Sequence, residues 1–171
     1  MATVNPYRAP AAAVADAGEE FQPVRIFAVS GRIGRARYIA YSMGLSFLIM
    51  FLAGLIAAFA GAAGAILALA GYAAVLVLLF MLTIQRAHDF DTTGWLSLLV
   101  LIPLVNFIFW FIPGTDGENR FGARTPPNST LVIVGMLLIP IVFVGGILAA
   151  VAIPAYQDYV KRAQAKQLQK K

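Results

Sequence analysis

The chain alternates between long apolar runs and short polar segments. Four runs, at about 38–60, 64–84, 95–113 and 131–153, contain no Asp, Glu, Lys, Arg or His. Each is close to or above the roughly 20 helical residues that cross the hydrocarbon core of a bilayer. Buried helices of a soluble bundle would carry polar stripes instead. The pattern predicts an all-α membrane protein with four transmembrane helices and short loops.

The polar segments divide the chain into three parts. Residues 1–23 are rich in Ala and Pro and are predicted to form a disordered N-terminal arm. Residues 24–130 form a membrane domain with the first three spans, and 131–171 hold the fourth span and a basic C-terminal helix. The short link 61–64 predicts that the first two spans form an antiparallel hairpin. Asn106, the most polar residue of any span, is expected to form an interhelical hydrogen bond.

Composition and charge narrow the function classes. The chain is 60% hydrophobic, only 12% charged, and has no cysteine, which excludes disulfides and thiolate metal sites. The net charge of +5 comes from basic residues beside apolar runs, as in membrane-flanking segments, so nucleic acid is not an expected partner. The expected partners are the bilayer, its anionic phospholipids and another membrane protein, and no cofactor is expected. The residues expected to contact lipid headgroups are Arg32, Arg35, Arg37, Lys161, Arg162 and Lys166.

The distribution of basic residues predicts the topology. The segment before the first span and the C-terminal tail each carry five Lys or Arg residues, and the loop between the second and third spans carries one, whereas the loop between the third and fourth spans carries two. Four spans with both termini in the cytoplasm place most positive charge inside. A re-entrant third run is the alternative, and it would leave the basic tail outside.

The first polar loop, 86–95, contains the only histidine. His88 and Asp89 are typical of a proton relay or of half a metal site, but one imidazole and adjacent carboxylates make a poor metal cage. The favoured interpretation is that Arg86 and His88 anchor the cytoplasmic interface, while the turn residues Asp91 to Gly94 start the third span. The candidate functional loop is Arg86, His88, Asp89, Gly94 and Trp95, with no catalytic and no metal-binding residue assigned.

The second polar loop, 114–128, reads as consecutive turns in which glycine provides positive φ angles. Its acidic and amide side chains do not match a twelve-residue calcium loop, and its arginines are suited to a lipid phosphate. A structured turn is the simpler interpretation. Its candidate residues are Gly114, Gly117, Glu118, Asn119, Arg120 and Gly122.

Both loops, together with the entry to the first span, resemble the YhaH-like bacterial inner-membrane family, domain of unknown function family 805. The resemblance covers roughly residues 27–127 and implies a small bacterial inner-membrane protein with no known reaction. It is carried by Gly31, Arg32, Arg35 and Tyr38, by Arg86, His88, Asp89, Gly94 and Trp95, by Ile102 and Pro103, and by Gly114, Thr115, Gly117, Glu118, Asn119, Arg120, Phe121 and Gly122.

The last helix resembles the N-terminal helix of type IV pilins from Gly146 to about Gln164, GILAAVAIPAYQDYVKRAQ. Pilins are cleaved after a glycine and carry a glutamate shortly downstream. Val132 and Leu137 stand at those positions here. The resemblance therefore indicates a pilin-like helix but not a pilin subunit.

These patterns leave several functions open. The favoured hypothesis is a non-catalytic scaffold or modulator of an inner-membrane complex, since the spans carry no charge and the loops carry turn motifs. A small neutral-solute transporter or channel, an accessory protein of type IV pilus machinery, and a membrane-embedded enzyme using His88 and Asp89 are the alternatives.

Overall fold

The computed structural model describes residues 20–102 and 104–168, except for the side chains of the last two of them. The predicted disordered arm lies almost wholly outside these residues, as do the last two lysines. Within them the chain is helical and has no strand, apart from an isolated bridge between Asn119 and Gly122. The all-α prediction is confirmed.

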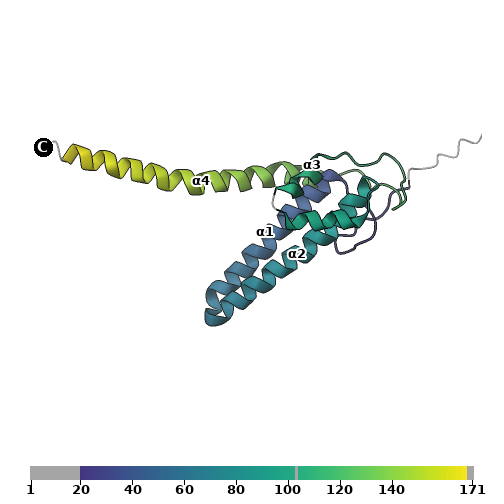
Figure 1. Ribbon diagram of the computed structural model, residues 1–171, viewed down its shortest axis with the longest axis horizontal. Coiled ribbons are helices and arrows are strands. Elements are labelled where there is room, and N and C mark those ends of the chain that lie inside the picture. Colours follow the sequence, from purple (N-terminus) through teal and green to yellow (C-terminus); the bar gives the residue numbers. More distant parts are fainter. Residues whose placement is uncertain (1–19, 103, 169–171) are drawn as a thin grey trace, which may run out of the picture.

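The first two runs form an antiparallel helical hairpin, as predicted (Figure 1). Helix α1 (Arg35–Phe59) connects through the short 3-10 helix η1 (Gly61–Ala63) to α2 (Gly64–Asp89). Two glycines of α2 permit the close approach. A Cβ on Gly71 would lie 2.6 Å from the Cβ of Ala53, and one on Gly64 would lie 2.5 Å from the Ala57 carbonyl oxygen.

The third run does not form the predicted membrane-length helix. It folds as two 3-10 helices, η2 (Gly94–Leu101) and η3 (Val105–Phe107), followed by the single turn α3 (Ile108–Phe111). Ile102 is extended, and Leu104 has a φ of 71°, so the backbone turns between the two halves. The membrane-spanning helix expected over 95–113 is therefore not found in residues 95–102 and 104–113.

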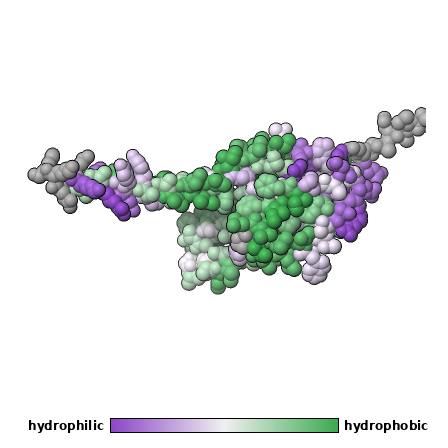
Figure 2. Space-filling model, turned by 45° about the horizontal axis from the view of Figure 1, so that its top comes forward, coloured by the Kyte–Doolittle hydropathy of each residue, from purple (hydrophilic) through white to green (hydrophobic). Residues whose placement is uncertain are grey.

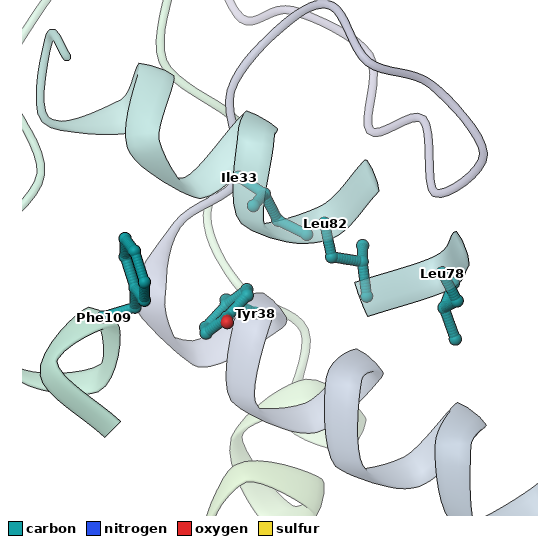
Figure 3. Packing of buried hydrophobic residues seen from close by; sticks show 5 residues of the cluster. All are labelled: Ile33, Tyr38, Leu78, Leu82 and Phe109. Atoms are coloured by element: carbon teal, nitrogen blue, oxygen red, sulfur yellow. The ribbon is translucent and has the colours of Figure 1, made fainter. Parts of the chain in front are cut away.

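Tertiary contacts hold the third run in this form. Asn106 accepts a hydrogen bond of 2.7 Å from the Tyr38 hydroxyl of α1, which confirms its predicted interhelical role. Phe109 is 1% exposed and packs edge-on against the Tyr38 ring. Figure 3 shows the five buried members of this core, with Phe109 and Tyr38 on one side, Leu78 on the other, and Ile33 and Leu82 between them.

Helix α4 (Thr130–Leu168) is the longest element, with 39 residues, and it continues through Pro140 and Pro154. It packs against α1 only near its start, where Val132 meets Ala36 and Ala40. Residues 141–159 are all exposed. In Figure 1, α4 begins beside the first turns of α1 and then diverges from the α1–α2 hairpin.

Among the described residues, α1, α2 with η1, and α4 are the helices long and apolar enough to cross a membrane. In Figure 2, hydrophilic surface gathers at the loop end of the molecule and along the last part of α4, with hydrophobic surface between them. Residues 24–34, 86–93 and 114–129 make up the loop end, called the polar end below.

Candidate functional site

The polar end is built around the last turn of α2. The helix stops at Asp89, because Phe90 leaves helical geometry and Asp91 adopts a φ of 57°, a left-handed conformation that aspartate tolerates. Arg86 and His88 lie in this last turn, where positive charge interacts favourably with the helix dipole. Asp89 lies beside them and is 6% exposed.

Asp89 lies between two buried arginines. Its Oδ1 accepts hydrogen bonds of 3.2 Å from both Nε and Nη2 of Arg32, and its Oδ2 accepts one from Nη1 of Arg86. Arg32 is 2% exposed and Arg86 is fully buried. Both carboxylate oxygens thus accept hydrogen bonds from charged donors. Hydrogen bonds between charged groups are among the stronger ones in proteins. These residues form the Arg32–Asp89–Arg86 cluster.

The two arginines also bind backbone carbonyls of distant segments. Arg32 donates from Nη1 to the oxygen of Gly117 at 2.7 Å and from Nη2 to that of Thr115 at 2.6 Å. Arg86 donates from Nε to the Phe109 oxygen at 3.0 Å and from Nη2 to the Ile112 oxygen. The cluster therefore joins the entry to α1, the end of α2, the end of the third run and the second polar loop.

The second polar loop is fastened to the end of α2 by its own polar groups. The Thr115 amide and hydroxyl both donate to the Asp89 carbonyl, at 2.8 and 2.7 Å. The Asn119 amide group donates to the His88 carbonyl at 2.8 Å. The backbone of Gly114 lies against the Asp89 carboxylate, and a Cβ added to Gly114 would be 2.2 Å from Asp89 Oδ2. A residue with a side chain at position 114 would displace the carboxylate from its arginines.

His88 is held on three sides. Its Nδ1 is 3.1 Å from the Gly31 carbonyl oxygen, so this nitrogen carries the hydrogen of the bond. Its ring stacks on Phe121, with centroids 3.8 Å apart and planes inclined by 7°. On the remaining side, a Cβ on Gly94 would be 3.5 Å from His88 Nε2. His88 as a whole is 8% exposed, and its ring packs between the loops.

Other predicted site residues lie at the surface of the same end. Arg120 donates to the Asp91 carboxylate at 3.0 Å in an exposed ion pair, and its guanidinium lies over the Phe121 ring. Gly122 has a φ of 107° and provides a carbonyl to Arg32, while Glu118 is exposed. Trp95 is 77% exposed and takes no part in the cluster.

The structure corrects the prediction that Arg32 and Arg37 contact lipid headgroups. It also corrects the prediction that Arg86 anchors the chain at the membrane interface. Arg32 is buried in the cluster, and Arg37, 6% exposed, donates to the carbonyl oxygens of Pro126 and Pro127 at 2.7 and 2.8 Å. Arg86 is fully buried and bonded within the protein, so its side chain is not exposed for contact with the lipid headgroups. Backbone carbonyls and Asp89 take the place of lipid phosphate as their partners. The remaining four predicted headgroup residues, Arg35, Lys161, Arg162 and Lys166, are exposed.

The structure also corrects the relative placement of the loops. Four spans would put the loop after the third run on the opposite side of the membrane from Arg32. Instead, the carbonyls of Thr115, Gly117 and Gly122 are bonded to Arg32 itself. Both polar loops and the entry to α1 therefore share one end of the molecule.

Sequence reasoning missed part of the polar network. Gln85 is 1% exposed. Its side-chain amide donates to the Ala28 carbonyl, and its backbone carbonyl accepts from the Ile33 amide at 3.2 Å. Thr83 is fully buried and lies 3.0 Å from the Tyr38 hydroxyl. The available signal was the position of Thr83 and Gln85 beside the Arg86–Asp89 motif, at the end of an otherwise apolar run.

The polar side chains of this end are bonded mainly to one another and to backbone carbonyls. Among residues 20–102 and 104–168, no group of three or more His, Asp or Glu side chains is placed to hold a metal ion. The Asp89 carboxylate is saturated by arginines. The fold and this end together define a class: a helical membrane protein whose loops are joined by a buried ion-pair cluster.

Comparison with known proteins identifies the family. Residues 26–123 match the family described as "Protein of unknown function (DUF805)", and the chain belongs to this family. It is 35% identical over 99 residues to inner membrane protein YhaH of Escherichia coli (strain K12), an alignment that covers 52% of this chain and 82% of the relative. It is 29% identical over 97 residues to inner membrane protein YhaI of the same strain, covering 54% of this chain and 81% of the relative. No solved structure shows significant similarity to the chain.

These comparisons confirm the predicted YhaH-like family and the membrane assignment. The matched residues 26–123 include the whole cluster, the first polar loop and the second polar loop as far as residue 123. Helix α4 lies outside the match, so its likeness to pilins remains a resemblance in sequence.

Proposed function

We propose that the chain is a non-catalytic protein of the inner membrane that binds another membrane protein through α4. In this proposal the Arg32–Asp89–Arg86 cluster makes the polar end a rigid base, and α4 extends from that base as the binding helix. The observation that carries the proposal is the exposure of every residue of α4 from 141 to 159.

The surface of α4 favours a helical partner. Gly145, Ala149 and Ala152 follow one another at helical spacing, and a Cβ on Gly145 would meet nothing within 4 Å. Small residues let two helix backbones approach closely, which is how many membrane helices associate. Near its start, by contrast, α4 is already packed against α1 through Val132.

The bonding of the cluster supports a role without catalysis. A general acid or base must reach the proton that it transfers. Asp89 has both oxygens engaged by arginines, and His88 has one nitrogen bonded to Gly31 and one ring face covered by Phe121. The side-chain oxygen of Asn106, the most polar residue of the apolar runs, accepts a hydrogen bond from the Tyr38 hydroxyl.

Site-specific photo-crosslinking in native membranes tests the proposal. A photoreactive amino acid at Leu148 or Val151, which are 64% and 68% exposed, should yield a crosslinked band with one defined membrane protein. The matched control is Phe51 of α1, which is 57% exposed and lipid-facing in this proposal. Crosslinks to lipid alone from all three positions would contradict it.

We further propose that the polar end and the N-terminal arm face the cytoplasm. The exposed Arg25 and Arg35 and the surface ion pair of Arg120 lie at this end. Positively charged loops are retained on the cytoplasmic side of the inner membrane. A cytoplasmic C-terminus as well would require a complete crossing by residues 95–113.

A second candidate function is an accessory role in type IV pilus machinery. It is favoured by the pilin-like sequence from Gly146 to Gln164 together with the form of α4, one uninterrupted helix that runs away from the polar end. Deletion of residues 145–171 should reduce twitching motility without loss of the protein from the membrane. Unchanged motility in a strain that accumulates the truncated protein would exclude this candidate.

A further inference from the structure

Both ends of the third apolar run are fastened to the same end of α2. Just before the run, the Thr92 amide donates to the Ala87 carbonyl at 3.0 Å. Just after it, the Thr115 amide donates to the Asp89 carbonyl at 2.8 Å, and Arg86 holds the carbonyls of Phe109 and Ile112. The run leaves the polar end and returns to it.

The depth that the run reaches is about half a bilayer. Its first half, η2, has 8 residues, which at about 2 Å per residue of 3-10 helix extend about 16 Å. Leu96 and Leu99 of η2 pack against a core that includes Leu78 of α2. Leu78 precedes Asp89 by about three helical turns, or about 16 Å along α2. The hydrocarbon core is about 30 Å thick.

The two faces of the run have different surroundings. Phe109 is buried against α1 and α2, and Trp110 packs beside the same core. The outward face is apolar and strongly exposed, with Trp95 at 77%, Leu104 at 77% and Phe111 at 75%. An exposed apolar face at one end of a membrane hairpin is expected to contact lipid acyl chains. Trp95 is of the residue type that is enriched at the membrane–water interface.

We infer that residues 95–113 form a re-entrant element that enters one leaflet from the polar end and returns to the same side, so that the chain crosses the bilayer three times. The partner of its outward face is the lipid of that leaflet. The basic end of α4 then emerges on the side opposite to the polar end. This inference concerns topology and holds whether or not α4 binds a partner.

Two forces on the topology oppose each other. The basic tail, with Lys161, Arg162 and Lys166, favours a cytoplasmic C-terminus and hence a fourth crossing. A fourth crossing would carry residues 114–122 to the other side of the membrane. Arg32 would then keep its ion pair with Asp89 but lose its bonds to Thr115 and Gly117, so that buried N–H donors of its guanidinium would be left unpaired. In the folded chain the cluster prevails over the charge of the tail.

The absence of native cysteine makes the test direct. Single cysteines are introduced by Thr93→Cys, Ala62→Cys, Asp116→Cys and Lys166→Cys, all at exposed positions. A membrane-impermeant maleimide is then applied to spheroplasts before and after permeabilisation. Positions 93 and 116 should react only after permeabilisation, and positions 62 and 166 in intact spheroplasts.

Position 116 decides between the models. Labelling of Asp116→Cys in intact spheroplasts while Thr93→Cys stays protected, together with protection of Lys166→Cys, would overturn the inference and establish four crossings. Glu118→Cys replaces Asp116→Cys if that variant does not accumulate, because both residues are exposed in the same loop. The labelling needs no partner protein, so failure of the α4 crosslinking experiment leaves this test unaffected.

Discussion

Arg32 and Asp89, 57 positions apart in the chain, form a buried ion pair in which Nε and Nη2 of the arginine both lie 3.2 Å from Oδ1 of the aspartate. The same guanidinium binds the loop that follows the third apolar run. This pair therefore decides which loops share one end of the molecule. Loss of either partner affects the whole polar end.

Asp89→Asn should destabilise the protein strongly, because it leaves two buried guanidinium groups without a carboxylate. Removal of one partner from a buried pair typically costs about 3–5 kcal/mol. Thermal unfolding in detergent, followed by tryptophan fluorescence, measures the change. The control is Asp91→Asn, whose ion pair with Arg120 is about half exposed and should contribute at most about 1 kcal/mol. Equal effects of the two substitutions would contradict a special role for the buried pair.

Gly114→Ala should lower stability by about 1–3 kcal/mol, because overpacking a filled site forces its neighbours to move. The added methyl group would lie 2.2 Å from the Asp89 Oδ2. Gly145→Ala is the matched control, since a Cβ there meets nothing within 4 Å. It should be neutral or slightly stabilising in detergent, where alanine is the better helix former. A stable Gly114→Ala protein would show that Asp89 can shift without loss.

Tyr38→Phe should destabilise the contact between α1 and the third run. The hydroxyl lies 3.0 Å from Thr83 Oγ1 and donates to Asn106 Oδ1 at 2.7 Å, and its loss leaves buried polar groups unpaired. Such a loss costs about 1–3 kcal/mol. Tyr72→Phe, at a position 54% exposed on α2, serves as the control and should leave the melting temperature unchanged. Identical melting curves for the two variants would argue against a role for the Tyr38 hydroxyl.

The two tryptophans report on the outward face of the third run. Trp95 is 77% exposed, whereas Trp110 is partly buried against the core. In liposomes that contain brominated acyl chains, the Trp110→Phe variant, which retains Trp95, should be quenched more strongly than Trp95→Phe. Weak quenching by lipid and strong quenching by aqueous acrylamide at Trp95 would place this face in water.

Much of the fold was predictable because its cause is local. A sufficiently long apolar run without charge favours a membrane-length helix, and this argument correctly predicted α1, α2 and the apolar part of α4 as helices long and apolar enough to cross a bilayer. The short link around Gly61 correctly predicted their antiparallel hairpin. The same argument failed for 95–113, where length and composition are satisfied but long-range contacts impose another path.

The candidate site was predictable in membership but not in arrangement. The motif residues Arg32, Asp89 and Gly114 were selected from the sequence, yet their spacing does not indicate that they touch. Arg86 was expected at the membrane interface because arginine beside an apolar run usually lies there. It is buried instead, because Asp89 and two carbonyls of the third run satisfy its charge and donors.

The sequence by itself determined that this is a helical membrane protein, and it determined the family. These properties depend on the length of uncharged runs and on motifs within short segments. Only the tertiary structure decided that both polar loops lie at one end and that the third run folds back toward it. The physical reason is that a buried carboxylate needs partners, and Asp89 finds one of them 57 residues away in the chain, at Arg32. The pattern of hydrophobic and polar residues along the chain does not predict such a long-range contact.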